Sequence, residues 1–410
     1  MGLYKRMIEE QDDQGWCFTD QYVCTGCVED DVLEAVLGAA ERDEDVCSFC
    51  GRSPAAELDV LLETFVAAVC NEYRSADDEG VSWDGREGGY QWTILETWEV
   101  VENCGGSDVL VGEGLLEAVY DAIIDKPWVP ADFIAPRRDE ALRDGWARLC
   151  EQVQYRTRYV FWLREPEEEY LGAGEVSAAR ILDHVGDIVD RLGLVKELPA
   201  GTRLWRALTH DESQVDWDAR RLGTAPRQYA RQANRMSPAG IPMFYGAIDA
   251  ETAVEETSLR SEEPWATAAA FEMSSPCHVV DFTDLPLVPS LFDLDRAADR
   301  RPLMFLRDFA AQLTAPARST YEQIDYVPTQ VVTEYLLHVF RREAPVSGML
   351  YTSSLTGKMA AVLDVPNERC VDRGTDVPGR GDSRLSLVLD SASRRTIPCP
   401  ERRSSAPGER

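Results

Sequence analysis

No stretch of this sequence approaches the roughly 18 uninterrupted apolar residues that a membrane-spanning helix requires. Residues 1–6 run straight into acidic residues without the apolar core of a signal peptide. These two absences argue against insertion into a membrane and against export. We therefore expect a soluble, cytoplasmic protein.

Basic residues are scarce relative to acidic ones. The 410-residue chain has 42 lysine and arginine residues against 73 aspartate and glutamate residues, which gives a net charge of −31. Such a surface repels a polyanion unless basic residues gather in one patch, so we expect no nucleic-acid partner. The hydrophobic fraction of 44% is nevertheless that of a globular protein. At about 150 residues per domain, the length predicts two or three domains.

Eleven cysteines are present, and without an export signal they are expected to be thiols or metal ligands rather than disulfides. Four of them form two Cys-x-x-Cys pairs, Cys24 with Cys27 and Cys47 with Cys50. Each pair can present two sulfur atoms from a tight turn, and zinc favours four thiolates. Four sulfur ligands leave no open position for a substrate, so we predict a structural zinc ion. The alternative is that these cysteines are reduced surface thiols.

The pattern of apolar residues changes along the chain. Steps of three and four at Leu58, Leu61, Leu62, Phe65 and Val69 predict a helix. Further helices are predicted at 115–124, 146–162 and 176–192, the last ending at Gly193. We predict an α+β protein with a zinc-knuckle module at 1–53, a helical bundle at 54–198, a mixed α/β domain at 199–371 and a flexible tail at 372–410. Within this tail, residues 385–389 are a candidate extra strand.

Short strands and turns in the second half carry side chains suited to chemistry. Arg206 lies in the predicted strand Leu-Trp-Arg-Ala, and Arg235 and Tyr245 lie in Arg-Met-Ser-Pro-Ala-Gly-Ile-Pro-Met-Phe-Tyr-Gly-Ala. Glu256 follows in a predicted helix, and Ser353 in Gly-Met-Leu-Tyr-Thr-Ser-Ser. Guanidinium groups bind phosphate oxygens bidentately, and a carboxylate suits a ribose or a developing cation. Taken singly, each residue is explained as well by a surface ion pair, a core aromatic ring or a turn hydroxyl.

The order and wording of these motifs resemble the RES domain, a family named after an arginine, a glutamate and a serine. The resemblance covers residues 201–370 and includes the string Tyr-Val-Pro-Thr-Gln at 326–330. The cysteine and helical region in front resembles the HEPN/RES N-terminal architecture. Together they imply a fold related to ADP-ribosyltransferase toxins, with NAD as the substrate.

Carried over by motif, the resemblance makes Arg206, Glu256 and Ser353 the catalytic residues and adds Arg235 and Tyr245 to the NAD site. Glu255 is adjacent to Glu256, but neighbours on a helix point about 100° apart, so only one can face a cleft. The motif favours Glu256.

The resemblance implies a toxin or defence effector that cleaves the nicotinamide–ribose bond, with water or phosphate as the acceptor. Because the ribosyl carbon gains oxocarbenium character, electrostatic stabilisation should dominate. We expect Arg206 and Arg235 to hold phosphate oxygens, Tyr245 to wall the nicotinamide, and Glu256 to steady the ribose and its charge. Ser353 is expected to bind the ribose or a phosphate.

Other functions stay open from the sequence. One is protein ADP-ribosylation with NAD, and another is a non-catalytic nucleotide sensor whose N-terminal half docks a partner. HEPN ribonucleases often carry an arginine and a histidine with four to six residues between them. The nearest match here runs from Arg180 to His184, with only three residues between them, so the ribonuclease motif is absent. An antitoxin or regulatory protein is a candidate partner that no motif identifies.

Overall fold

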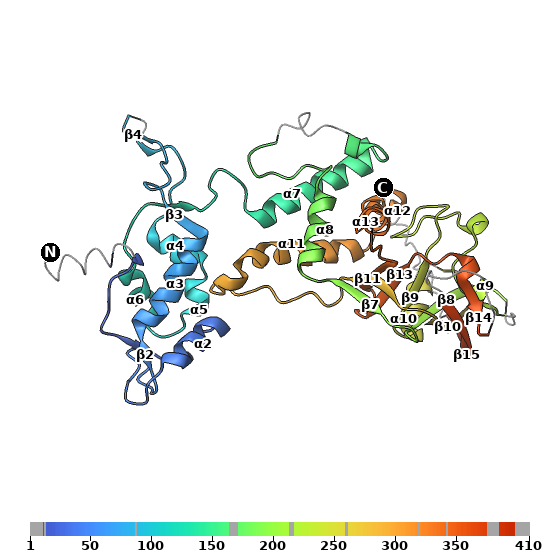
Figure 1. Ribbon diagram of the computed structural model, residues 1–410, viewed down its shortest axis with the longest axis horizontal. Coiled ribbons are helices and arrows are strands. Elements are labelled where there is room, and N and C mark those ends of the chain that lie inside the picture. Colours follow the sequence, from blue (N-terminus) through green and yellow to red (C-terminus); the bar gives the residue numbers. More distant parts are fainter. Residues whose placement is uncertain are drawn as a thin grey trace, which may run out of the picture. The chain divides into compact units, whose positions relative to one another are not determined.

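The structure is a computed structural model, and it describes residues 11, 14–86, 88–163, 171–212, 217–258, 261–318, 320–341, 343–374 and 385–397. The chain divides into two compact units that are not continuous in sequence (Figure 1). The N-terminal unit comprises Met1–Asp139 and Leu287–Met304, and the C-terminal unit comprises Glu140–Pro286 and Phe305–Arg410. A segment from the middle of the second half therefore belongs to the first unit.

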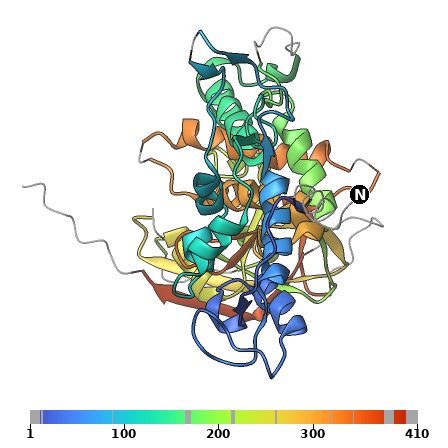
Figure 2. The ribbon, with the colours of Figure 1, turned by 90° about the vertical axis from the view of Figure 1, so that its left-hand side faces the viewer.

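The N-terminal unit consists of short helices and three two-stranded sheets (Figure 2). Its helical elements are η1 (Thr25–Cys27), α2 (Asp31–Ala40), α3 (Leu58–Glu72), α4 (Thr97–Asn103), α5 (Gly106–Val109), α6 (Leu115–Ala122) and η6 (Leu294–Arg296). Its paired strands are β1 (Tyr22–Val23) with β2 (Ala56–Glu57), β3 (Tyr73–Ser75) with β6 (Trp128–Pro130), and β4 (Trp83–Asp84) with β5 (Gly89–Tyr90).

The core of this unit forms around α3. The predicted apolar stripe of this helix is confirmed, because Leu58, Leu61, Leu62, Phe65 and Val69 are each at most 1% exposed. The same core includes leucines of α2 and three of the four paired cysteines. The cysteine pairs therefore share one core with α3 instead of forming a module of their own.

The segment Leu287–Met304 completes this unit. Phe292 packs against Phe65, with 5.2 Å between the ring centroids. Arg301 at the start of α11 (Ala297–Thr314) forms ion pairs with Glu72 and, at 2.9 Å, with Asp139. Opposite charges with little solvent exposure hold the segment in place.

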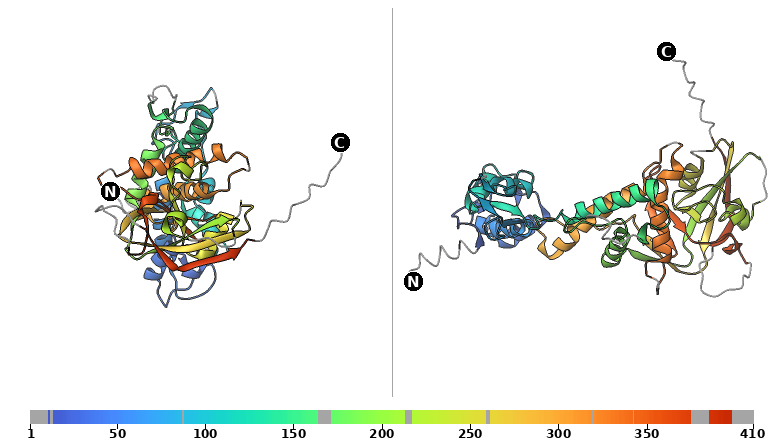
Figure 3. Two further views of the ribbon diagram at one scale, coloured as in Figure 1. Left: turned by 90° about the vertical axis from the view of Figure 1, so that its right-hand side faces the viewer. Right: turned by 90° about the horizontal axis from the view of Figure 1, so that it is seen from above.

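The C-terminal unit is built on a nine-stranded sheet with the order β14-β15-β10-β8-β9-β13-β12-β11-β7. The strands are β7 (Val195–Leu198), β8 (Arg203–His210), β9 (Phe244–Ala247), β10 (Trp265–Met273), β11 (Cys277–Asp281), β12 (Gly348–Thr352), β13 (Met359–Leu363), β14 (Cys370–Asp372) and β15 (Leu385–Thr396). Neighbouring strands are antiparallel except β11 with β12 and β14 with β15. The left view of Figure 3 shows β15 (red) beside β10 (yellow) at one border of the sheet.

The C-terminal unit also contains several helices. They are α7 (Arg138–Glu151, which begins at the unit boundary), the π-helix η2 (Gln152–Arg156), η3 (Phe161–Leu163), α8 (Ile181–Arg191), α9 (Ala219–Leu222), η5 (Arg227–Tyr229), α10 (Ala250–Ser258), the second half of α11, α12 (Glu322–Asp325), α13 (Val327–His338) and η7 (Asn367–Arg369). The α8 helix ends at Arg191, and Gly193, two residues further on, has a φ of 63°, which confirms the predicted terminator.

The single helical bundle expected at residues 54–198 does not form. The α3 and α6 helices belong to the N-terminal core, whereas α7 and α8 pack with α11, α13 and the sheet in the other core. An apolar stripe shows that a helix needs a partner, but it does not specify which partner. The mixed α+β class is confirmed, with helices and one large sheet.

The expected flexible tail contains an ordered strand. Leu385–Thr396 forms β15, longer than the candidate strand at 385–389, and pairs with both β10 and β14. The tail residues 375–384 and 398–410 lie outside the described residues. None of the helices in the described ranges combines the length and apolar character needed to cross a membrane.

Candidate active site and metal centre

The two Cys-x-x-Cys pairs converge on one point. Their four sulfur atoms, from Cys24, Cys27, Cys47 and Cys50, all lie within 4.8 Å of one another. The closest approach is 3.4 Å between the Sγ atoms of Cys24 and Cys50. Converging thiols with no other metal ligand among them fit a soft, tetrahedrally bound ion.

The environment of the four thiols favours a cation bound between them. Burial raises the pKa of Cys24 to about 11, because a lone thiolate there would be poorly solvated and close to other sulfurs. Burial also acts to raise the pKa of Cys47, but hydrogen bonds from backbone N–H groups, including those of Phe49 and Cys50, bring it down to about 7. A bound cation would stabilise all four thiolates together.

In the C-terminal unit, Glu256 and Ser353 meet although 97 residues separate them. Ser353 Oγ donates a hydrogen bond to Glu256 Oε1, and Ser353 is only 2% exposed. The same Oγ accepts from the backbone N–H groups of Leu355 and Thr356, at 3.2 and 3.3 Å. These two donors occupy the lone pairs of the hydroxyl and so direct its hydrogen towards the carboxylate.

The helix that carries Glu256 is fixed at both its face and its start. Ala253 of α10 packs against small residues of β8, β9 and β10, which lets the helix lie close to the sheet. At its start, Asp249 accepts from the backbone N–H of Thr252 at 2.8 Å and pairs with Lys358 Nζ at 2.9 Å. Lys358 lies in the turn that follows Ser353, so this ion pair joins the two segments that carry Glu256 and Ser353.

Glu255 is exposed like Glu256, but it makes no such bond in the part of the chain that the structure describes. The helical spacing turns the two carboxylates to different sides, as expected.

Tyr245 and Arg235 lie on the same side of the sheet as this pair, close to α11 and α13. The hydroxyl of Tyr245 accepts from the backbone N–H of Met236 and bonds to Ser237 Oγ, both at 3.1 Å. Burial raises the pKa of Tyr245 to about 12. The guanidinium of Arg235 donates to the carbonyls of Leu313 and Ala315 at the end of α11.

Arg206 does not join these four residues. By strand alternation its side chain lies on the same face of β8 as Leu204, opposite to the face of Trp205, which pairs with Ala247. Its guanidinium lies over the ring of Phe244 and donates to two backbone carbonyls, Gly223 O and Tyr245 O, both at 3.0 Å. Burial lowers the pKa of this arginine. Its contact with the site runs through the backbone of Tyr245.

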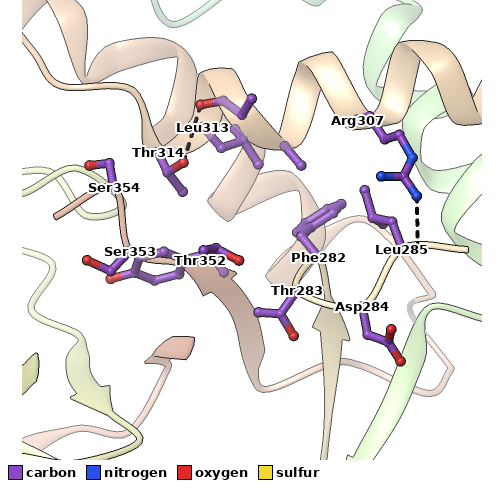
Figure 4. Close-up of a pocket in the computed structure, with 13 residues that line it drawn as sticks. Phe282, Thr283, Asp284, Leu285, Arg307, Leu313, Thr314, Thr352, Ser353 and Ser354 are labelled. Atoms are coloured by element: carbon purple, nitrogen blue, oxygen red, sulfur yellow. Dashed lines mark hydrogen bonds between the residues drawn. The ribbon is translucent and has the colours of Figure 1, made fainter. Parts of the chain in front are cut away.

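A pocket of about 400 Å³ lies beside Ser353 (Figure 4). In Figure 4, Thr352 extends towards Phe282 and Thr283, whereas the hydroxyl of Ser353 points to the opposite side. Its wall comprises Phe282, Thr283, Asp284, Leu285, Arg307, Ala310, Ala311, Leu313, Thr314, Tyr351, Thr352, Ser353 and Ser354. The lining mixes apolar surface with several hydroxyl groups, as ligand pockets commonly do.

Tyr351 is the residue that connects the pocket with the predicted site residues, and the sequence did not single it out. It is 9% exposed, lines the pocket and lies two residues before Ser353. Burial raises its pKa far above the ordinary value, the charges of Glu256 and Tyr245 add to this, and Arg235 opposes it. Alternation along a predicted strand was the available signal, because residues two apart tend to share a face.

Two family models match the chain. The model described as HEPN/RES N-terminal domain 1 matches residues 40–167, and the RES domain model matches residues 203–382. Neither the curated proteins nor the solved structures include a significant match. Arg206, Arg235, Tyr245, Glu256 and Ser353 all fall within the RES match. The chain is therefore a RES domain protein with a HEPN/RES N-terminal domain.

Proposed function

We propose that this protein consumes NAD by cleaving the bond between nicotinamide and ribose. The RES family is associated with NAD-related toxin function, which supports NAD as the substrate. The observation that carries the proposal is the hydrogen bond from Ser353 to Glu256 at the wall of the pocket. Two residues from distant parts of the chain thereby bring an oriented hydroxyl and a carboxylate together, and one of them, Ser353, lines the cavity.

Glu256 is the group that stabilises the reacting sugar in this proposal. When the C–N bond breaks, its electron pair leaves with nicotinamide, which becomes neutral, and positive charge develops on the ribosyl carbon. A fixed carboxylate stabilises that charge more than it stabilises the ground state. Among the described residues, Ser353 binds one carboxylate oxygen of Glu256, and in this proposal the other oxygen interacts with a ribose hydroxyl or with the developing cation.

Ser353 keeps the carboxylate in place. Its hydroxyl is held by two backbone N–H groups, so it presents its hydrogen to Glu256 without a further ordering cost. The Asp249–Lys358 ion pair supports the same arrangement from outside the pocket. The serine is therefore both a wall of the pocket and an anchor for the acid.

The two arginines take different roles in the proposal. Arg235 spans from the end of α11 towards Tyr351 and has guanidinium N–H groups left for a phosphate oxygen beyond those that hold Leu313 and Ala315. Arg206 acts through Tyr245, whose backbone it holds where β8 and β9 pair at a single position. Tyr245 then serves as a wall for the nicotinamide ring.

We further propose that the four-cysteine cluster holds a structural zinc ion. Four thiolates close the coordination sphere, so such an ion supplies no catalytic water and belongs to the fold of the N-terminal unit.

Product analysis tests the proposed reaction. The purified protein is incubated with NAD, with and without inorganic phosphate, and the products are identified by mass spectrometry. We expect free nicotinamide together with ADP-ribose, or with its phosphorylated form when phosphate is the acceptor. A mass increase on protein instead would assign ADP-ribosylation, and NAD binding without release of nicotinamide would assign a sensor.

A further inference from the structure

The hydroxyl of Tyr351 is buried at the pocket without a partner. Within the described ranges, no hydrogen bond involves this oxygen, although the side chain is only 9% exposed. The unpartnered and fully enclosed side-chain atoms of the structure belong to Gln152, Ser177 and Thr252. The oxygen of Tyr351 is not among them, so it retains access to the pocket that the residue lines.

The phenol of Tyr351 carries a donor that no described protein group uses. A phenylalanine would fill the same position without that donor. The unused donor therefore points to a ligand acceptor in the pocket.

The surroundings of Tyr351 favour a donor over a base. It lies on β12 opposite Ala360, which in turn pairs with Ala247, so Tyr351 and Tyr245 share one face of the sheet. Glu256 and Tyr245 oppose its ionisation, and burial does so most strongly. Because its pKa is raised, the phenol stays protonated and serves as a hydrogen-bond donor rather than as a base.

We propose that Tyr351 is a further catalytic residue, whose hydroxyl donates a hydrogen bond to an oxygen at the ribosyl–nicotinamide end of NAD. The inference rests on the proposed function. We assign this end of the dinucleotide because Tyr351 shares its pocket with Ser353. Ser353 in turn binds Glu256, the residue proposed to stabilise the ribose. A volume of about 400 Å³ is near the lower limit of ligand pockets, which suits one half of a dinucleotide.

Tyr351→Phe separates this role from simple packing. If the hydroxyl binds the substrate, kcat/KM for NAD falls about tenfold while the melting temperature stays the same or rises. A fall in kcat places the bond in the transition state, and a rise in KM places it in the bound substrate. The matched control is Tyr335→Phe on α13, a half-buried phenol of the same unit that does not line the pocket.

Each result bears on the inference. A Tyr351→Phe protein that consumes NAD at the wild-type rate overturns it and leaves the proposed function intact. An activity loss matched by a lower melting temperature, or by an equal loss in Tyr335→Phe, also overturns it, because packing would then explain the effect. A wild-type protein that does not consume NAD removes both the proposed function and this role.

Discussion

In the N-terminal unit the groups that carry chemistry face one another, whereas in the C-terminal unit two of them, Tyr351 and Ser353, line a cavity. The sulfur atoms of Cys24, Cys27, Cys47 and Cys50 all lie within 4.8 Å of one another. Around the pocket, Ser353 is held from behind by backbone N–H groups, and Tyr351 has no partner at all among the described residues. The cysteine cluster is suited to stabilising a fold, whereas the pocket leaves room for a ligand.

This comparison separates stability from function in one chain. Changes at the cysteine cluster should unfold a unit without a specific effect on a reaction. Changes at the pocket should alter the reaction and leave unfolding almost untouched.

The largest effect is expected from Cys27→Ser. Cys27 is 2% exposed in the core of the N-terminal unit, and structural zinc sites contribute on the order of 10 kcal/mol to folding in small domains. We expect loss of bound zinc by elemental analysis and unfolding of this unit by hydrogen exchange. Cys17→Ser, at an exposed thiol outside the cluster, should change neither. Full zinc content in Cys27→Ser would contradict the four-sulfur site.

Arg301→Met should destabilise the N-terminal unit by about 3 kcal/mol. Arg301 pairs with Glu72 and Asp139, whose side chains are 13% and 5% exposed, and its removal leaves two carboxylates poorly solvated. Arg42→Met breaks a pair with Glu57 at 4.0 Å whose side chains are more than half exposed, so it should cost at most about 0.5 kcal/mol. Urea unfolding followed in this unit measures both. Equal effects would mean that Leu287–Met304 is not anchored there as the structure describes.

The smallest effect is expected from Lys358→Met at the outer edge of the site. The backbone N–H of Thr252, followed by the Lys358 ammonium, lowers the pKa of Asp249 from its ordinary 3.8 to about 2. Because the pKa is lowered, the ionised Asp249 stabilises the folded state above about pH 4. This stabilisation is lost as the pH falls from about 4 to 2. Lys358→Met should therefore raise the pKa of Asp249 in an NMR titration, whereas Lys196→Met on the exposed border strand β7 should not. An unchanged pKa of Asp249 in Lys358→Met would mean that the Asp249–Lys358 ion pair does not form.

Local patterns predicted individual elements, but they did not predict their partners. The stripe of α3 and the terminator at Gly193 were predicted because helical periodicity and a positive φ are properties of a short segment. The return of Leu287–Met304 to the N-terminal unit depends on contacts such as Phe292 with Phe65, which no local pattern contains.

The same distinction applies to the site. Motif resemblance selected Glu256 and Ser353, and these two residues do lie in contact. The orientation of Arg206 depends on the register of β8 against β9, which the sequence does not specify, and this register turns its side chain away from the pocket face. Tyr351 was missed because a tyrosine in a buried strand is more often core than ligand-binding.

The Glu256→Gln and Glu255→Gln pair tests most directly whether the carboxylate of Glu256 acts on NAD. The two residues are neighbours on α10 with equal charge and exposed side chains, so global charge and helix effects cancel. We predict that Glu256→Gln slows nicotinamide release on the order of 10²–10³-fold at an unchanged melting temperature, and that Glu255→Gln retains the wild-type rate. Equal rates for the two variants would contradict the account.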